Sequence, residues 1–291
     1  MEIKPDYYDD FKCIAAECRH NCCIGWEIDI DDATLEIYKS QTGELKERLE
    51  NNISLEPCAH FVLQGDERCP FLNDKNLCDL ILHGGEEMLC EICHEHPRFY
   101  NDIYDVTEKG LGLCCEAAAK LILTKETPLT LISSSNEMPQ NDFHKTRNDI
   151  FAILQNRKVP LGYRIEELLS LANTTSPING TDWIEIYKSL ERLDPKWDEY
   201  LNSAKNISEE IPENLKIPAE QLICYFIYRH LSGGLEDLRI CERVRFAVLS
   251  LYVIMSLNKS ETVEEMLQIA RMYSAEIEYS DENIDILLEN L

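Results

Sequence analysis

The chain has 291 residues, of which 54 are acidic and 28 basic, so its formal net charge is −26. Such a charge repels nucleic acid and anionic membranes, and it favours solubility or a basic protein partner. No run of eighteen apolar residues predicts a membrane-spanning helix, and the acidic residues 1–11 do not resemble a signal peptide. We therefore expect a cytoplasmic protein that binds neither nucleic acid nor membrane.

The first elements in chain order are short. Alternating apolar and acidic residues predict a strand over residues 26–31. Asp31 or Asp32 can then cap a helix that runs to about Glu50. Residues 56–108 are rich in Cys, Gly, Pro and His and lack a sustained period, so they predict loops, short strands and one helix over 86–93. A region with so little regular apolar pattern needs cross-links, which a bound metal can supply.

The second half of the chain has a helical pattern. A helix over residues 111–123 leaves the Cys-rich region, and residues 124–141 predict a linker. Further helices are predicted over 144–156, 161–172, 181–193, 219–231, 235–257 and 262–278, with prolines between them or at their starts. We therefore predict a mainly α protein. Residues 1–125 form a Cys-rich metal-binding domain with short strands and loops, and residues 126–291 form an all-helical bundle.

Eleven of the thirteen cysteines lie at or before position 115. In a reducing compartment, clustered cysteines bind metal or do redox chemistry more often than they form disulfides. Thiolates from several short loops can converge on a tetrahedral metal ion or on an iron-sulfur cluster, each of which takes four cysteines in the simplest case. Cys224 and Cys241 lie on apolar helix faces, so we expect them to be core residues.

Several motifs of the Cys-rich region occur in an order that resembles a known family. They are Phe11-Lys12-Cys13, Cys18, Cys22-Cys23, Trp26, Ile28-Asp29-Ile30-Asp31, Cys69-Pro70-Phe71-Leu72, Leu77-Cys78-Asp79-Leu80, Gly85-Glu86, Cys93 with Pro97-Arg98, and Leu113-Cys114-Cys115. This order resembles the FliB family of flagellin lysine N-methylases, within a wider group of zinc- or iron-chelating cysteine-cluster proteins. The helical half is similar only in its general character.

The resemblance implies an iron-sulfur protein lysine N-methylase. Such a protein carries a 4Fe-4S cluster and uses S-adenosylmethionine to methylate lysine ε-amines of flagellin. The cysteines that match the family pattern, and are therefore implied as metal ligands, are Cys13, Cys18, Cys22, Cys23, Cys69, Cys78, Cys93 and Cys115. Cys58, Cys90 and Cys114 are extra in this matching. The family's closing Ser-Cys-Pro-Glu element reads Cys114-Cys115-Glu116-Ala117 here, so Cys114 can substitute for Cys115.

Lysine methylation needs a proton acceptor, because a lysine with a pKa of about 10.4 is mostly protonated at neutral pH. The candidates for this catalytic role are Asp29 and Asp31, of which Asp31 is also a candidate helix cap, and Tyr100 or Tyr104. Arg98, close to the implied ligand Cys93, can pair with the carboxylate of the methyl donor or offset the charge of the thiolates. Trp26 is expected to pack over the cluster. No Gly-rich loop after a strand indicates a common fold for binding the methyl donor.

Two other functions remain open from the sequence. In the first, zinc or a cluster only cross-links the irregular region of a non-catalytic metal-binding protein. In the second, the protein is a redox sensor, which the adjacent Cys22 and Cys23 favour. Zinc is accordingly the alternative to the iron-sulfur cluster, and the number of metal sites stays open.

Overall fold

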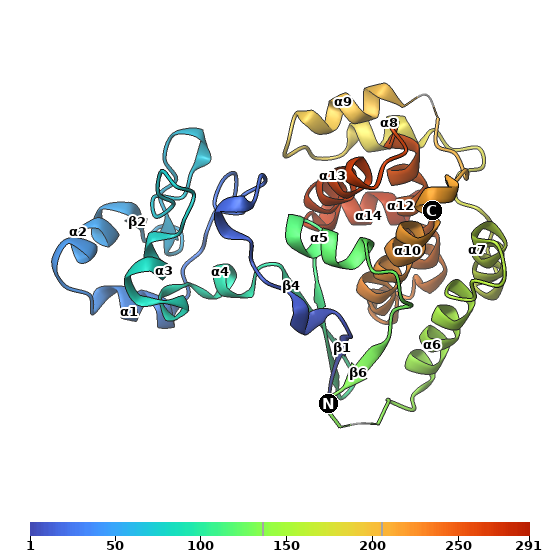
Figure 1. The fold of residues 1–291 in the computed structure, drawn as a ribbon, viewed down its shortest axis with the longest axis horizontal. Helices are drawn as coiled ribbons and strands as arrows, with labels where there is room; N and C mark the ends of the chain where they lie inside the picture. Colours follow the sequence, from blue (N-terminus) through green and yellow to red (C-terminus); the bar gives the residue numbers. More distant parts are fainter. Residues whose placement is uncertain (136, 205) are drawn as a thin grey trace. The chain divides into compact units, whose positions relative to one another are not determined.

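The computed structural model describes residues 1–135, 137–204 and 206–291 (Figure 1). The chain forms two compact units. The first unit consists of Met1–Phe11 and Tyr100–Leu291, and the second unit consists of Lys12–Phe99. As predicted, the protein is mainly helical, and its two sheets are small. The predicted division at residue 125 follows composition, whereas the division at Tyr100 follows contacts.

A four-stranded sheet, with strand order β4-β5-β1-β6, explains why the N-terminus belongs to the helical unit. β1 pairs in parallel with β5, where Ile3 lies opposite Glu108, and antiparallel with β6, where Ile3 lies opposite Ser133. Neither β1 nor β6 is predicted from the sequence, because each is too short to show an alternating pattern. The strands are β1 (Glu2–Pro5), β4 (Arg98–Ile103), β5 (Val106–Leu111) and β6 (Leu131–Ser133).

Ten α-helices are described in the first unit, and α10 and α12 form its centre. Most residues of these two helices are buried, 12 of 15 in α10 and 12 of 18 in α12, as expected for helices that are largely apolar on all sides. None of the helices in the described part of the chain is long and apolar enough to cross a membrane. The helices are α5 (Glu116–Leu123), α6 (Asp142–Leu154), α7 (Leu161–Leu171), α8 (Trp183–Ser189), α9 (Lys196–Ser203), α10 (Lys216–His230), α11 (Gly234–Asp237), α12 (Ile240–Leu257), α13 (Val263–Tyr273) and α14 (Asp281–Glu289).

Two long predicted helices of this unit are interrupted. The helix predicted over 235–257 is split into α11 and α12, because Leu238 adopts a left-handed conformation with a φ of 62°. The helix predicted over 262–278 is α-helical only to Tyr273 and continues as a π-helix over Ser274–Glu278. α9 and α14 are not predicted. The predicted linker contains β6, so it is partly ordered as a strand.

The π-helix ends at Glu278, whose carboxylate is buried among polar side chains of α10. One oxygen lies 2.6 Å from Nε2 of His230, and the other accepts a hydrogen bond of 2.9 Å from the Tyr225 hydroxyl. Nε of Arg229 lies 3.4 Å from the carboxylate. Burial raises the pKa of Glu278, but the Arg229 charge and the His230 hydrogen bond outweigh burial and lower this pKa to about 2.

We expect Glu278 to make the first unit sensitive to acid. A carboxyl group whose pKa is lower in the folded state stabilises the fold above its unfolded pKa of about 4.3, and this contribution disappears as the pH falls toward 2. The shift corresponds to about 3 kcal/mol at neutral pH. The free energy of unfolding of Glu278→Gln should therefore fall below wild type at neutral pH and approach it only as the pH reaches about 2. The exposed control Glu167→Gln should follow wild type throughout, and a difference for Glu278→Gln that does not change with pH would contradict this role.

The second unit has short elements around a small core. Its helices and strands are α1 (Asp32–Lys39), α2 (Gly43–Asn52), β2 (Ile53–Ser54), β3 (His60–Phe61), α3 (Asp79–Gly84) and α4 (Glu91–Glu95). The buried residues are mostly apolar, and two of them are cysteines: Ile28, Ile30, Tyr38, Leu49, Phe61, Cys69, Phe71, Leu72, Leu80, Met88 and Cys90.

The strand predicted over residues 26–31 is wrong in type but correct in burial. Ile28 and Ile30 point into the core, as the alternation indicates, but the backbone forms only an isolated bridge between Asp29 and His60. The helix predicted to reach Glu50 is two helices, because Thr42 is extended and Gly43 has a φ of 69°. The predicted cap of α1 is confirmed, since Asp31 Oδ1 accepts a hydrogen bond of 2.9 Å from the Thr34 amide.

Candidate metal centre

Five cysteines of the second unit lie in or against its apolar core, and we call them the core thiols. Cys69 and Cys90 are buried in the core, while Cys23, Cys78 and Cys93 are half-buried and pack against it. They come from three separate chain segments, so tertiary folding brings them together. Four of them belong to the eight ligands that the family resemblance implies, and Cys90 does not.

Backbone contacts position Cys23, Cys69 and Cys78. The Cys69 amide donates a hydrogen bond of 2.8 Å to the Cys23 carbonyl oxygen. Cys78 forms a bridge with Leu72 at the end of a tight loop that starts at Cys69. Arg48 of α2 holds the ends of this loop, because its guanidinium donates to the Pro70 carbonyl oxygen and to the Asp79 carboxylate, both at 2.6 Å.

Cys90 and Cys93 form a close pair at the start of α4. The amides of Cys93 and His94 both donate to the Cys90 carbonyl oxygen, at 3.0 and 2.9 Å. The Glu91 amide donates at 2.8 Å to Oδ2 of Asp31, the carboxylate whose other oxygen caps α1. This turn places the two sulfur atoms 3.4 Å apart.

Burial favours the protonated form of two core thiols, Cys69 and Cys78, because it raises their pKa. It raises the pKa of Cys69 to about 11, with a smaller contribution from the thiol of Cys78, and it also raises the pKa of Cys78. Tyr38 lies beside the same thiols and donates its hydroxyl to the Met88 carbonyl oxygen at 2.8 Å. A metal bound here would therefore have to displace protons from thiols, as thiolate ligation generally requires.

The chemistry of the core thiols fits a soft metal. Sulfur donors select zinc or an iron-sulfur cluster over magnesium or calcium. Within residues 1–135, 137–204 and 206–291, however, no group of three or more His, Cys, Asp or Glu side chains already has the arrangement of a metal site. Among the core thiols, the sulfur atoms of Cys90 and Cys93 are already close to each other, at 3.4 Å. The other core thiols would have to turn toward this pair to complete a site.

The remaining predicted ligands lie outside the core thiols. Cys13 and Cys22 are exposed, and Cys18 is half-buried. The Cys13 sulfur accepts a hydrogen bond of 3.4 Å from the Ala15 amide, a contact that suits a thiolate. Cys115, the last ligand implied by the resemblance, lies in the first unit, where it precedes α5.

The extra cysteines have individual environments. Cys114 is buried in the first unit and donates its S–H to the Tyr279 hydroxyl at 3.1 Å. Cys58 is exposed and donates to Oδ1 of Asp29 at 3.5 Å. Cys224 is a core residue as predicted, but the same prediction for Cys241 is wrong. This cysteine is exposed, because α12 begins only at Ile240 and its first turn is not yet covered.

The four other predicted site residues have defined places in the two units. Asp29 and Trp26 lie in the loop after Cys23, with Asp29 exposed and Trp26 half-buried. Arg98 starts β4 and donates to the His94 carbonyl oxygen at 3.1 Å, which ties it to the end of α4. Tyr100, also in β4, is 45% exposed and belongs to the first unit. The catalytic and binding roles of these residues stay predictions.

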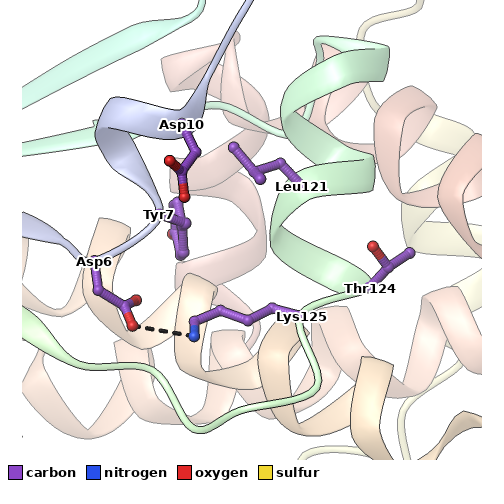
Figure 2. A pocket seen from close by; sticks show the side chains of 6 residues that line it. All are labelled: Asp6, Tyr7, Asp10, Leu121, Thr124 and Lys125. Atoms are coloured by element: carbon purple, nitrogen blue, oxygen red, sulfur yellow. Dashed lines mark ion pairs between the residues drawn. The ribbon is translucent and has the colours of Figure 1, made fainter.

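A surface cleft of about 320 Å³ lies in the first unit (Figure 2). Figure 2 shows Lys125 reaching toward Asp6, with which it forms an ion pair of 3.0 Å. The cleft is lined by Asp6, Tyr7, Asp10, Leu121, Thr124 and Lys125. These residues do not include any predicted catalytic, binding or metal residue.

Cys90 is the residue of the candidate metal centre that the family pattern does not include. Its Cys-x2-Cys spacing with Cys93 is visible in the sequence and is typical of metal-binding pairs. Motif matching nevertheless left Cys90 out as an extra, because the family pattern contains only the second cysteine. In the folded chain the sulfur atoms of this Cys-x2-Cys pair lie 3.4 Å apart.

Comparison with known proteins shows a weak likeness. Over 135 residues, or 44% of this chain, it is 24% identical to the flagellar biosynthetic protein FliU of Salmonella muenchen, of which the match covers 80%. It is also 24% identical over 135 residues to the lysine-N-methylases of Salmonella choleraesuis and Salmonella typhimurium, and this match spans only 34% of each. No family model and no solved structure matches the chain. The chain is thus similar, at low identity and over less than half its length, to proteins of the FliB type.

Proposed function

We propose that the protein is a protein lysine N-methylase whose second unit binds metal through its cysteines. The observation that carries this proposal is the similarity to two lysine-N-methylases. The five core thiols support the metal part, because a small unit with short elements gathers sulfur donors in its core. The matched methylases are about three times as long as the matched segment, so their activity comes to this chain as a proposal.

The proposed reaction transfers a methyl group from S-adenosylmethionine to a lysine of flagellin. The new bond joins the methyl carbon to the lysine nitrogen, the sulfonium bond to that carbon breaks, and S-adenosylhomocysteine leaves. The lysine ammonium must first lose a proton, and we propose that Asp29 or Tyr100 accepts this proton. Arg98 would pair with the donor's carboxylate, and Trp26 would cover the metal centre. The net charge of −26 suits a substrate that presents lysines.

The cysteines can supply ligands for more than one metal group. The eight implied ligands and Cys90 exceed the four that a 4Fe-4S cluster takes. Cys13, Cys18 and Cys22 lie outside the core and would contribute ligands to a cluster, while the core thiols would hold a second metal. When bound, a cluster supplies thiolate-held iron for electron transfer or for binding of the methyl donor.

A methyl-transfer assay tests the activity. The full chain, purified without oxygen, is incubated with flagellin and S-adenosylmethionine, and flagellin is analysed by mass spectrometry. We expect mass gains in multiples of one methyl group, located on lysines. Cys93→Ala should lower the metal content together with methyl transfer, and Cys224→Ala should leave the metal content unchanged. Flagellin with chemically blocked lysines serves as the matched substrate control. An unchanged flagellin mass with fully metal-loaded protein would rule out this substrate and reaction.

The packing of the core thiols also favours a second function, a non-catalytic metal-binding protein. Structural zinc sites consist of four protein ligands that cross-link short loops, and the core thiols lie in loops of this kind. Iron, zinc and acid-labile sulfide are therefore measured in the anaerobic preparation, together with its visible spectrum. A colourless protein that contains zinc, lacks iron and does not transfer methyl groups would have this second function.

A further inference from the structure

The surface cleft of about 320 Å³ in the first unit has no role in the proposed methyl transfer. We propose that this cleft binds an aliphatic primary ammonium group, which is the end of a free alkyl amine or of a lysine side chain. Asp6 and Asp10 would hold the ammonium, and Leu121 would contact the alkyl chain. The inference goes beyond the proposed function, because the residues that line the cleft do not take part in that reaction.

Two chain segments form opposite walls of the cleft. One wall is the segment after β1, where Figure 2 shows Tyr7 between Asp6 and Asp10. The amides of Asp6 and Asp10 donate hydrogen bonds of 2.8 and 3.1 Å to carbonyl oxygens, which fixes the backbone of this wall. The other wall is the end of α5 and the residues that follow it. Its Leu121 side chain points across the cleft toward Asp10, and its Lys125 side chain points toward Asp6 (Figure 2).

The charges that line the cleft favour a cation. Asp6 and Asp10 contribute two negative charges, and Lys125 contributes one positive charge. The Lys125 ammonium is already paired with Asp6 at 3.0 Å, and its side chain is only 14% exposed, so it is poorly placed to bind an anion. Asp10 is exposed, and its carboxylate has no ion pair or hydrogen bond within the described residues. The cleft is therefore expected to attract an ammonium and to repel a carboxylate or a phosphate.

The ion pair of Lys125 shows that an alkyl ammonium fits beside Asp6. The second carboxylate oxygen of Asp6, Oδ1, is covered and has no hydrogen-bond partner among the residues that the structure describes. A buried acceptor without a donor costs free energy, and an ammonium has three N–H donors that it can share between Asp6 and Asp10. Burial raises the pKa of Tyr7, and the Asp6 charge raises it further, so the Tyr7 hydroxyl stays protonated and neutral.

The size and the apolar part of the cleft indicate a small ligand with an alkyl chain. Pockets that hold drug-sized molecules have volumes of about 300–1,000 Å³, so a cleft of about 320 Å³ lies at the lower end of this range. Leu121 is half-buried and presents an apolar surface next to the carboxylates. Alkyl ammonium groups combine an apolar stem with a charged end in the same way.

Saturation-transfer NMR of the full chain tests the site at a salt concentration of about 0.15 M, which screens distant charges. The probe is n-butylamine, and 1-butanol is the neutral control of the same length. We expect the amine to bind at least about tenfold more tightly than the alcohol, because hydrogen bonds between charged groups are the strong ones. Asp10→Asn should weaken amine binding by at least about tenfold. Equal binding of amine and alcohol would overturn the inference.

A matched variant and a cleft-filling variant locate the binding. Asp9→Asn removes the adjacent exposed carboxylate, which does not line the cleft, and should bind n-butylamine like wild type. Thr124→Trp keeps both carboxylates but adds bulk to the cleft, so it should lose amine binding. Thermal unfolding of each variant confirms that it is folded. Wild-type affinity in folded Asp10→Asn or folded Thr124→Trp would place the amine elsewhere and contradict the proposal.

Peptides distinguish the two sources of the ammonium. An acetylated and amidated tripeptide with a central lysine is compared with n-butylamine, and the same tripeptide with norleucine is the control. Tighter binding of the lysine peptide would identify a lysine side chain of a protein as the ligand, and weaker binding would identify a free amine. Because these measurements do not involve methyl transfer, a chain that binds amines but leaves flagellin unmodified would refute the methylase and retain this site.

Discussion

Replacing Glu108 by Ala is expected to destabilise the first unit by about 3–5 kcal/mol, the usual cost of removing one partner of a buried ion pair. Glu108 of β5 and Arg147 of α6 form such a pair, and both are fully buried. Burial raises the pKa of Glu108, but the hydrogen bond with His144 and the charge of Arg147 lower it overall, so the carboxylate is ionised. Without it, the Arg147 charge is buried and uncompensated.

The surroundings of Arg147 increase this cost. Its guanidinium lies over the ring of Tyr228 at 5.2 Å and over those of Phe143 and Phe151 at 5.5 and 5.9 Å. Its Nε and Nη2 atoms have no hydrogen-bond partner among the residues that the structure describes. Cation–π contacts compensate only part of the lost hydration.

Urea unfolding of the full chain measures the effect. The double variant Glu108→Leu with Arg147→Met should recover most of the lost stability, because no charge then remains buried. The surface pair Glu185 and Lys188 provides the control, and Glu185→Ala should cost less than about 1 kcal/mol. Equal effects of Glu108→Ala and Glu185→Ala would show that the buried pair does not stabilise the fold.

Removing metal is expected to unfold the second unit and to leave the helices of the first unit intact. Within the described part of the second unit, β2 and β3 form a sheet of their own and have two residues each. The longest helix of this unit, α2, has ten residues. Elements this short are marginal without cross-links. Structural zinc contributes about 10–16 kcal/mol of apparent binding free energy in small domains at neutral pH, so its loss exceeds the stability of a typical domain.

Hydrogen exchange read by mass spectrometry checks this expectation. After incubation with a strong chelator and a reductant, peptides around Tyr38, Phe71 and Met88 should lose their protection from exchange. Peptides from α10 and α12 should exchange as before. Addition of zinc should restore protection in the second unit, and this recovery is the control for irreversible damage. Identical exchange with and without chelator would show that the core holds itself together without metal.

The sequence predicts helices of the first unit where a 3.6-residue period persists. α7 and α12 fall wholly within predicted ranges, and α6 and α10 overlap theirs but begin two and three residues earlier, because the apolar faces of these helices repeat over several turns. β1 is missed because its partner in β5 lies about a hundred residues further along the chain, and such pairing leaves no local pattern. The break at Leu238 is also missed, since a leucine with positive φ does not carry the signal that a glycine would.

The candidate site is predictable in its chemistry and only partly in its membership. The cysteine spacing indicates metal binding, but the gathering of Cys23, Cys69 and Cys90 depends on how three loops fold onto one core. Nothing local in the sequence shows this. The family pattern does not include Cys90, whose sulfur atom lies 3.4 Å from that of Cys93 in the folded chain.

The discontinuous first unit has a consequence for the order of assembly during synthesis. β1 leaves the ribosome first, yet its partners β5 and β6 are made only after the whole of residues 12–99. At about 5–20 residues per second, several seconds separate these events. The second unit can therefore fold, and bind the metal that we propose for it, before the sheet closes. In a cell short of this metal, residues 12–99 would stay unfolded between β1 and β5, the two strands that have to pair.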